Sequence, residues 1–165
     1  GTQRNNVLSP STLSLERHRL LWLYLNAETD FFTAPKKVLH FAPEQAFYKR
    51  FRNQKNLDYT TTDLFSPLAD VKADICDLPF EDNQYDIILC NHVLEHIPDD
   101  TKAMQELYRV LKPGGMGIFQ IPQAAIYTFV GPEPPHVKNE FCFKILLRQQ
   151  PHNCSDITST MYRLK

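Results

Sequence analysis

The stretch "DLPFEDNQYDIILCNHVLEHIPDDTKAMQELYRVLKPGG", residues 77–115, decides the fold. Its segment "YDIILC" (85–90) is apolar throughout, which is typical of a strand that is covered on both faces. The segment "PDDTKAMQELYRVLKPGG" (98–115) predicts a helix, because its apolar side chains recur on one face and a Pro-Gly-Gly sequence ends it. The apolar run "MGIFQIP" (116–122) predicts the next strand. A strand, a helix and a second such strand in this order indicate a right-handed crossover between parallel strands.

The same alternation of strands and helices extends towards the N-terminus. The runs "KKVLHFA" (36–42) and "LDYTTTDL" (57–64) predict strands, and "EQAFYKRFRNQ" (44–54) between them predicts a helix. "VKADICDLPF" (71–80) contains a third short strand-like run. The sequence therefore predicts an α/β protein with a doubly wound, mainly parallel sheet, which is the Rossmann-like arrangement.

The chain is expected to be a single globular domain in two parts. Residues 1–34 comprise a polar lead-in and an amphipathic helix, "LSLERHRLLWLYLNAETDFF", with Ser14 as its N-cap. The apolar face of that helix is expected at Leu20, Leu23 and Tyr24. Residues 35–165 form the Rossmann-like domain.

Composition and charge exclude several classes of function. Lys and Arg total 18 against 19 Asp and Glu, a net charge of -1, so nothing indicates a nucleic acid or an acidic membrane as partner. No apolar run reaches the length of a membrane span. The four cysteines form no Cys-x-x-Cys pair, so we expect a cytoplasmic protein without a cysteine-based metal site. The oligomeric state is not predicted by the sequence.

Polar and small side chains follow the predicted strands, where a doubly wound sheet binds its ligands. Carboxylate and amide acceptors at several strand ends would share one rim and suit the hydroxyl and amine groups of a nucleoside-type ligand. The candidate ligand-binding residues are Phe41, Ala42 and Glu44 after the first strand, Asp63 and Leu64 after the second, Asp74 and Ile75 after the third, and Asn91 and His92 after the fourth.

Four motifs within residues 38–122 resemble those of one enzyme family. They are Asp-x-x-x-Leu-Pro-Phe (74–80), Tyr-Asp (85–86), Val-Leu-Glu-His (93–96) and Leu-Lys-Pro-Gly-Gly (111–115). Their combination resembles the class I S-adenosylmethionine-dependent methyltransferases of the small-molecule type. "SLERHRLLWLYL" and "VLHFAPE" also resemble a bacterial subgroup of that family. The resemblance implies the Rossmann-like methyltransferase fold, S-adenosylmethionine as cofactor and a small-molecule methyl acceptor.

The resemblance also implies roles for individual positions. Asp63 would accept hydrogen bonds from both ribose hydroxyls, which one carboxylate can do at once. Asp74 would accept from the adenine amino group, with Ile75 packed on the ring. Asn91 and His92 would border the amino acid portion and the sulfonium.

The loop after the first strand, beginning at Phe41, would approach the methionine part of the cofactor, and here the chain departs from the family. "LHFAPEQAF" contains no glycine, the residue that allows the closest backbone approach, so Ala42 has to serve in its place. Glu44 either binds the ammonium group of the cofactor or is a favourable first-turn acid of the next helix. Both interpretations stay open. His40 is expected to be a half-buried histidine with satisfied hydrogen bonds rather than a ligand.

The N-terminal part also departs from the subgroup. Residues 9–12, Ser-Pro-Ser-Thr, stand where the subgroup carries a zinc-binding Cys-Pro-x-Cys, so we expect no metal there. Arg17, His18 and Arg19 are expected on a solvated helix face, with contact to an anionic substrate as the alternative.

The segment after Pro122 is the least regular part of the pattern. "NEFCFKILLRQQ" (139–150) predicts a helix and "DITSTMYRLK" (156–165) predicts a short strand. The family fold usually continues with two more strands. The sequence leaves open whether the C-terminal edge of the sheet is incomplete, and whether a substrate lid or the activity is lost as a result.

The catalytic hypothesis rests on two histidines. Methyl transfer from a sulfonium mainly needs alignment and a dry pocket, and a general base helps if the acceptor is a hydroxyl or amine, so His92 and His96 are candidates. One rival hypothesis is a cofactor-binding Rossmann-like domain without catalysis. A second is a zinc peptidase, because residues 92–96 match H-x-x-E-H. That motif needs one continuous helix, whereas a strand runs into Asn91 and Pro98 follows closely, so we reject it.

Overall fold

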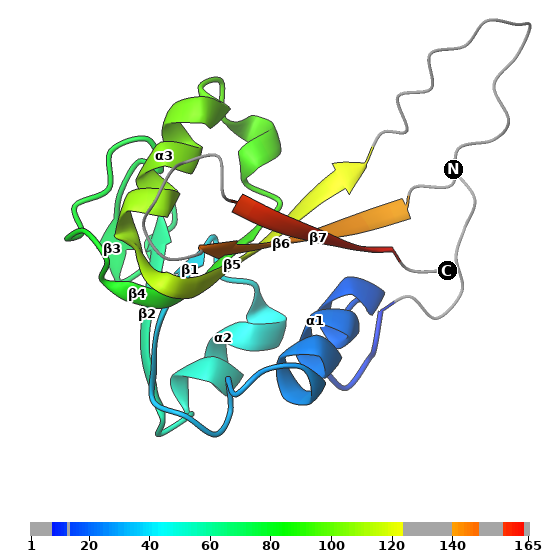
Figure 1. Ribbon diagram of the computed structural model, residues 1–165. Coiled ribbons are helices and arrows are strands. Elements are labelled where there is room, and N and C mark those ends of the chain that lie inside the picture. Colours follow the sequence, from blue (N-terminus) through cyan, green and yellow to red (C-terminus); the bar gives the residue numbers. More distant parts are fainter. Residues whose placement is uncertain (1–7, 13, 124–139, 149–156, 164–165) are drawn as a thin grey trace, which may run out of the picture.

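The computed structural model describes residues 8–12, 14–123, 140–148 and 157–163. Its helices are α1 (Glu16–Ala27), α2 (Gln45–Arg52), the short 3-10 helix η1 (Leu94–His96) and α3 (Asp100–Val110). Its strands are β1 (Lys36–Phe41), β2 (Leu57–Asp63), β3 (Val71–Lys72), β4 (Tyr85–Asn91), β5 (Leu111–Gln123), β6 (Glu140–Arg148) and β7 (Ile157–Arg163). Figure 1 shows one twisted sheet with helices on both of its faces.

The strands form a single seven-stranded sheet in the order β3-β2-β1-β4-β5-β6-β7. The strands from β3 to β5 pair in parallel, and β6 and β7 extend the sheet through antiparallel pairs. The chain order reverses at β1, which lies between β2 and β4, so β1 and β4 flank the topological switch point. Five parallel strands covered by helices confirm the predicted doubly wound, Rossmann-like fold class.

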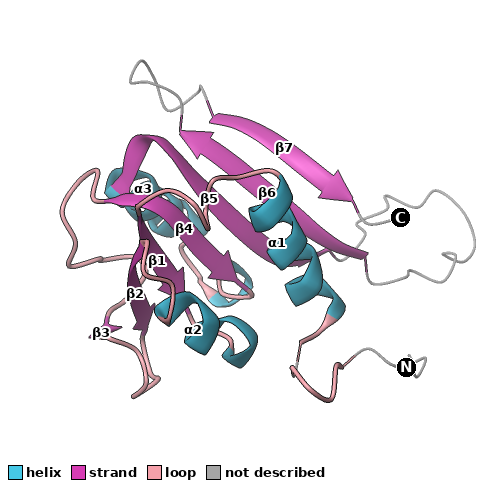
Figure 2. Cartoon of the chain, turned by 90° about the horizontal axis from the view of Figure 1, so that it is seen from below, coloured by secondary structure: helices cyan, strands magenta, loops and turns pink. Residues whose placement is uncertain are grey.

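The helices create two buried layers, one on each face of the sheet (Figures 1 and 2). α3 covers the face that carries the register partners Leu39 and Ile88, and Leu107 of α3 is buried with them. α1 and α2 cover the opposite face, which carries the partners Val38 and Ile87. Adjacent residues thus bury their side chains on opposite faces, which explains why the strands are apolar throughout rather than alternating.

The predicted helix over 98–115 forms α3, but it ends earlier than the sequence predicts. The last helical residue is Val110, and Leu111 is already extended, with ψ of 131°, and pairs with Tyr85. The Pro-Gly-Gly sequence therefore lies inside β5, where Gly114 takes a φ of +79°. Pairing with β4 outweighs the local stop signal, so the strand begins where the helix ends.

α1 begins one residue later than predicted and turns a different face inwards. Leu15 rather than Ser14 is the N-cap residue, and its backbone N–H donates to His18 Nδ1 at 3.0 Å. The buried side chains of α1 are His18, Leu21 and Leu25. Leu23, predicted to lie on the apolar face, is 62% exposed. The packing surface offered by α2 and the sheet decides this choice, because the helix is apolar on more than one side. The predicted boundary at residue 34 stays a prediction, and residues 1–7 of the predicted lead-in lie outside the described residues.

The segment after Pro122 contains two strands rather than a helix and a strand. Within the predicted helix 139–150, Glu140–Arg148 forms β6, antiparallel to β5. The helix prediction was therefore wrong, because the open edge of β5 determines the state of a short apolar run that fits both patterns. The predicted strand over 156–165 is confirmed as β7. The sheet thus continues beyond the fifth strand. None of the described helices is long and apolar enough to cross a membrane.

Candidate active site at the carboxyl edge of the sheet

The two strands at the switch point both end in a left-handed turn. Ala42, directly after β1, has a φ of +44°, and His92, directly after β4, has a φ of +55°. The backbone N–H of Ala42 donates to Thr62 O at 2.9 Å, and that of His92 donates to Gln120 O at 2.9 Å. The chain therefore leaves the sheet sharply at both places. Ala42 takes a conformation that favours glycine, and its side chain is the smallest that has a Cβ.

Glu44 is the centre of a charged cluster beside this turn. Its Oε1 accepts hydrogen bonds from Arg17 Nη2 and His18 Nε2, both at 2.7 Å, and its Oε2 accepts one from Asn91 Nδ2 at 3.3 Å. Burial alone would raise the pKa of Glu44, but the hydrogen bonds from His18 and Arg17 outweigh it and lower the pKa to about 2. The carboxylate is therefore ionised at neutral pH.

This cluster changes the interpretation of Glu44 and of its two partners on α1, Arg17 and His18. Glu44 occupies the N-cap position of α2, but its side chain makes no capping hydrogen bond. It turns instead towards α1 and β4, so it does not act as a helix-start acid through a side-chain cap. The expectation that Arg17 and His18 lie on a solvated face was wrong, whereas Arg19 is exposed and donates to Ser14 O at 3.0 Å. Because these partners are 26 and 27 residues apart in sequence, no local pattern could reveal them.

Several buried polar atoms near the cluster have no hydrogen-bond partner within the described part of the chain. Asn91 and Gln120 are register partners on β4 and β5, and each is 2% exposed. Asn91 Oδ1 and both amide atoms of Gln120 lack partners there. An unsatisfied buried polar group costs roughly 1–3 kcal/mol, so these atoms are candidates for contact with a ligand. The side chains suit a ligand that both donates and accepts hydrogen bonds at the end of β4 and β5.

His40 is buried completely on β1, more deeply than the sequence predicted. Its Nδ1 forms a 2.7 Å hydrogen bond with the hydroxyl of Tyr59, while its Nε2 has no partner among the described residues. Burial lowers the pKa of His40 to about 4, against an opposing effect of the Glu44 charge. The imidazole is therefore neutral at physiological pH, and only one of its nitrogens is satisfied.

Asp63 ends β2 with a carboxylate that is only partly used. Its Oδ1 accepts from the backbone N–H groups of Phe65 and Ser66, both at 2.7 Å, which shapes the turn after the strand. A carboxylate has two oxygens, so Oδ2 can still accept from a ligand. Leu64, Phe65 and Leu68 expose 41%, 83% and 74% of their surface beside it. Of this apolar surface, the sequence predicted only Leu64.

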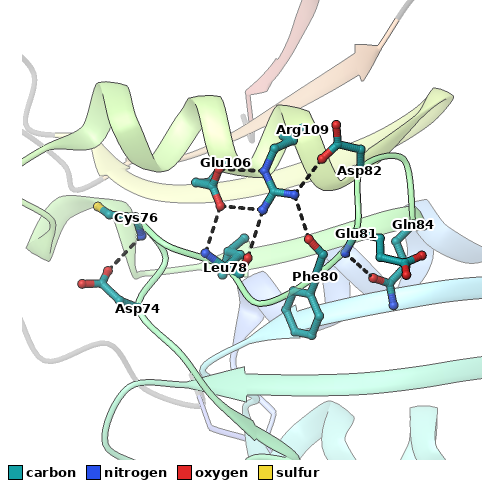
Figure 3. A network of polar contacts seen from close by, with 9 residues as sticks. All are labelled: Asp74, Cys76, Leu78, Phe80, Glu81, Asp82, Gln84, Glu106 and Arg109. Atoms are coloured by element: carbon teal, nitrogen blue, oxygen red, sulfur yellow. Dashed lines mark hydrogen bonds and ion pairs between the residues drawn. The ribbon is translucent and has the colours of Figure 1, made fainter.

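Asp74 and Ile75 lie on the loop after β3 and point in different directions. Asp74 is exposed, and its Oδ1 accepts from the backbone N–H of Cys76 at 2.8 Å (Figure 3). Ile75 is 4% exposed and packs in the core beneath α3. The Asp74 carboxylate is thus accessible at the edge of the sheet, whereas the Ile75 side chain is buried in the core. Phe41 is buried in the same layer, so only its backbone reaches the loop at Ala42.

The two histidines of the H-x-x-E-H match do not share a helix. His92 adopts the left-handed conformation at the end of β4, and its Nδ1 lies 3.1 Å from Glu95 Oε1. His96 is exposed at the end of η1. The predicted break in the helical pattern is confirmed. Among the described residues, no group of three or more His, Cys, Asp or Glu side chains could hold a metal ion.

A cavity of about 390 Å³ lies between α1, α2 and the residues Ser9, Thr12 and Ser14. Trp22 and Phe47 provide aromatic walls, and Arg50 lies over the Trp22 ring at 5.3 Å. His18 lines this cavity and also contacts Glu44, so the cavity borders the charged cluster. Its volume falls within the range of small-molecule sites.

The fold agrees with comparisons with known proteins. A sequence profile described as "Methyltransferase domain" matches residues 27–119, more than half of the chain. The chain belongs to this methyltransferase-domain family.

Two curated proteins and one solved structure illustrate the relationship. The chain is 39% identical over 71 residues to a 2-phytyl-1,4-naphtoquinone methyltransferase of Nostoc punctiforme, covering 43% of this chain and 28% of that protein. It is 48% identical over 48 residues to a demethylmenaquinone methyltransferase of Staphylococcus carnosus, covering 29% and 20%. The structure is of a protein from Galdieria sulphuraria, provisionally assigned as a sarcosine dimethylglycine methyltransferase. Its TM-score is 0.58 at 25% identity, and the match covers 74% of this chain and 52% of that one.

These relationships confirm the predicted family of methyltransferases. The matched part spans only 28% and 20% of the length of the two curated relatives.

Proposed function

We propose that the protein is an S-adenosylmethionine-dependent methyltransferase that acts on a small molecule. The observation that carries this proposal is the rim at the switch point. There, two partly used carboxylates, a left-handed turn at Ala42 and buried amide atoms that lack partners among the described residues lie at the edge where a doubly wound sheet binds its ligand.

The nucleoside end of the cofactor would lie over β2 and the loop after β3. Asp63 Oδ2 would accept the ribose hydroxyls while Oδ1 continues to hold the turn. Asp74 would accept from the adenine amino group. The exposed side chain of Leu64 is suited to cover the adenine ring, and the buried side chain of Ile75 supports the loop from below.

The amino acid end would lie beside the Glu44 cluster. Glu44 is an anionic acceptor at neutral pH and can receive an ammonium group through Oε2, next to Asn91. Arg17 Nε is buried and has no partner in the described part of the chain, so it can donate to a carboxylate. The ammonium and carboxylate groups of the cofactor's amino acid part would thus meet complementary groups of Glu44, Asn91 and Arg17. The backbone after Phe41 would approach the cofactor closely because the side chain of Ala42 is small.

The chemistry needs little from the protein beyond placement. S-adenosylmethionine supplies a methyl group that is already activated on a sulfonium. His92 borders the rim, and Glu95, 3.1 Å from its Nδ1, would stabilise the protonated ring if His92 takes a proton from a hydroxyl acceptor. His96 is the second candidate base, although its exposure on η1 makes it less suited to a dry site.

We further propose an aromatic acceptor. The names of the two curated relatives refer to a naphthoquinone and a menaquinone precursor. The cavity beside α1 adds aromatic walls of suitable size next to the Glu44 cluster. A cytoplasmic location remains a prediction that rests on cysteine usage.

Calorimetry with S-adenosylhomocysteine tests the cofactor site. Wild-type protein should bind it, and Asp63→Ala should weaken binding by at least about tenfold, since hydrogen bonds to a charged group contribute about 1.5–3 kcal/mol. Asp58→Ala is the matched control, because Asp58 is exposed on the same strand and makes only a 3.8 Å ion pair with Lys37. No heat from wild-type protein would refute both the enzyme and the non-catalytic alternative. Binding without methyl transfer to any of a panel of quinols, phenols and amines would favour the latter.

A further inference from the structure

The loop from residue 73 to residue 84, which carries Asp74, has little secondary structure of its own. β3 before it has only two residues, and Asp74 and Asp77 form one isolated bridge. Backbone hydrogen bonds to neighbouring strands therefore contribute little to the position of this loop. Side chains of α3 hold it instead.

Arg109 of α3 binds the backbone of this loop directly (Figure 3). Its Nη2 donates to Leu78 O at 3.0 Å, and its Nη1 donates to Phe80 O at 2.7 Å. Glu106, one turn earlier, accepts the backbone N–H of Leu78 at 2.9 Å. Leu78 is thus bound through both of its backbone polar groups by one helix. Asp82 adds a 2.8 Å ion pair with Arg109.

The two α3 side chains also hold each other. Arg109 Nε and Nη2 donate to the two oxygens of Glu106 at 2.8 and 2.7 Å, a bidentate pair. The hydrogen bond from Arg109 lowers the pKa of Glu106, and the hydrogen bonds to Glu106 and Asp82 raise that of Arg109. Both groups stay ionised across the physiological range. The planar fork of arginine binds the carboxylate through two N–H groups and still donates to two carbonyls, whereas the three N–H groups of a lysine ammonium cannot make all these hydrogen bonds.

The position of Leu78 is transmitted to Asp74 through a short, tight segment. Asp77 N–H donates to Asp74 O at 3.0 Å, and Cys76 N–H donates to the Asp74 carboxylate at 2.8 Å. Ile75 and Leu78 are both buried, at 4% and 5% exposure, in the layer beneath α3. A shift of Leu78 therefore moves the whole turn, including the carboxylate.

We propose that Arg109 is a positioning residue for cofactor binding: through Leu78 and Phe80 it places the Asp74 carboxylate for the adenine amino group, without touching the cofactor. Glu106 keeps the guanidinium in the orientation that this requires. This inference rests on the proposed function, because it assumes the role of Asp74. No local pattern indicates this role, since the contacts join residues 28 to 31 positions apart.

A double-mutant cycle in the full chain tests it, with S-adenosylhomocysteine as the probe in calorimetry and thermal unfolding as the check on folding. Arg109→Lys keeps the charge but loses the fork. It should weaken binding at least about fivefold, which is less than the roughly tenfold loss for complete removal of one charge-assisted hydrogen bond, because the Asp74 carboxylate is displaced rather than removed. Asp74→Ala should add little to Arg109→Lys, because the carboxylate is already misplaced. Asp63→Ala should add its full effect, since the Asp63 carboxylate is held by the backbone N–H groups of Phe65 and Ser66 and not by the residues that Arg109 contacts.

Two further variants separate placement from simple charge or general stability. The exchange Glu106→Arg with Arg109→Glu preserves an ion pair on α3. It removes the donor at position 109 that binds Leu78 O and Phe80 O, so it should not restore affinity. Asp82→Asn removes the exposed ion pair between Asp82 and Arg109, and this variant should bind S-adenosylhomocysteine like the wild type. If Arg109→Lys does not fold, Glu106→Gln, which retains an acceptor for Leu78 N–H, should reproduce the pattern at smaller size.

The inference is overturned if folded Arg109→Lys, or Glu106→Gln in its place, binds with wild-type affinity. It is also overturned if its effect adds fully to that of Asp74→Ala, or if the exchanged pair restores binding. Failure of the proposed function gives a different result, in which wild-type protein does not bind or Asp74→Ala has no effect on its own.

Discussion

Replacing Glu44 with Gln should destabilise the folded protein by an amount that depends on pH. The carboxylate is 18% exposed and accepts short hydrogen bonds from Arg17 and His18. Glutamine has nearly the same shape but no charge, and its single carbonyl oxygen replaces an ionised acceptor. The change leaves the guanidinium of Arg17 half-buried without its counter-charge.

The magnitude follows from the pKa of Glu44. This pKa is about 2 in the folded protein against an ordinary value of 4.5. By linkage, the difference corresponds to about 3 kcal/mol of stability at neutral pH. Because glutamine can still accept one hydrogen bond, we expect Glu44→Gln to cost about 2 kcal/mol at pH 7. A lowered carboxylate pKa stabilises above the unfolded value, so this contribution is complete above pH 4.5 and disappears as the pH falls towards 2.

Urea unfolding of wild-type protein and Glu44→Gln, repeated from pH 7 down to the lowest pH at which both fold, measures the effect. The difference in the free energy of unfolding should be largest at pH 7 and should shrink below pH 4.5. Glu28→Gln, at an exposed site after α1, is the matched control and should stay within about 0.5 kcal/mol of wild type.

The reasoning is refuted if Glu44→Gln is as stable as Glu28→Gln at pH 7. It is also refuted if the difference from wild type does not change between pH 7 and the acid limit. The first result would mean that the contacts of Arg17 and His18 with Glu44 contribute no net stability, and the second that their contribution does not depend on the charge of Glu44.

Three further predictions concern other positions. His40→Asn should reduce the pH dependence of the free energy of unfolding between pH 6.5 and pH 4, measured by urea unfolding. The buried imidazole of His40 has a lowered pKa of about 4, so wild-type protein loses stability over this range because the unfolded chain binds a proton that the folded protein does not. An unchanged slope in the variant would contradict this. Ala42→Gly should change stability by less than about 1 kcal/mol, because relief at a φ of +44° is offset by greater freedom of the unfolded chain, and calorimetry should show cofactor binding no weaker than wild type. Gly115→Ala should have a clearly lower melting temperature than Gly114→Ala. A Cβ at position 115 would lie 2.8 Å from Lys112 O and 3.0 Å from Asp86 O, whereas a Cβ at position 114 meets open space and is opposed only by the φ of +79°. Equal melting temperatures would show that β5 relaxes around the new side chain.

The sequence predicted the central elements well because their signals are local. β1, β2, α2 and β4 each correspond to an apolar run or periodic segment bounded by polar residues. The errors lie where a neighbour decides. The end of α3 was misplaced because Leu111 pairs with Tyr85, and β6 was taken for a helix because its partner β5 is not visible in its own residues.

The predicted site followed from position rather than from contacts. Knowing that ligands bind where parallel strands end was enough to select Asp63, Asp74, Glu44 and Asn91. It could not show that Asn91 is buried with an unpartnered oxygen, or that its amide donates to Glu44. Those facts depend on which faces meet, and the sequence pattern carries no information about that.

By itself, the sequence determined the fold class, the order of its central strands and the acidic residues at their ends, because hydrophobic periodicity and strand-end chemistry are written in neighbouring residues. Only the tertiary structure decided that α1 supplies the partners of Glu44 and that Arg109 holds the loop of Asp74. These contacts join distant segments, and their geometry exists only after the helices pack on the sheet.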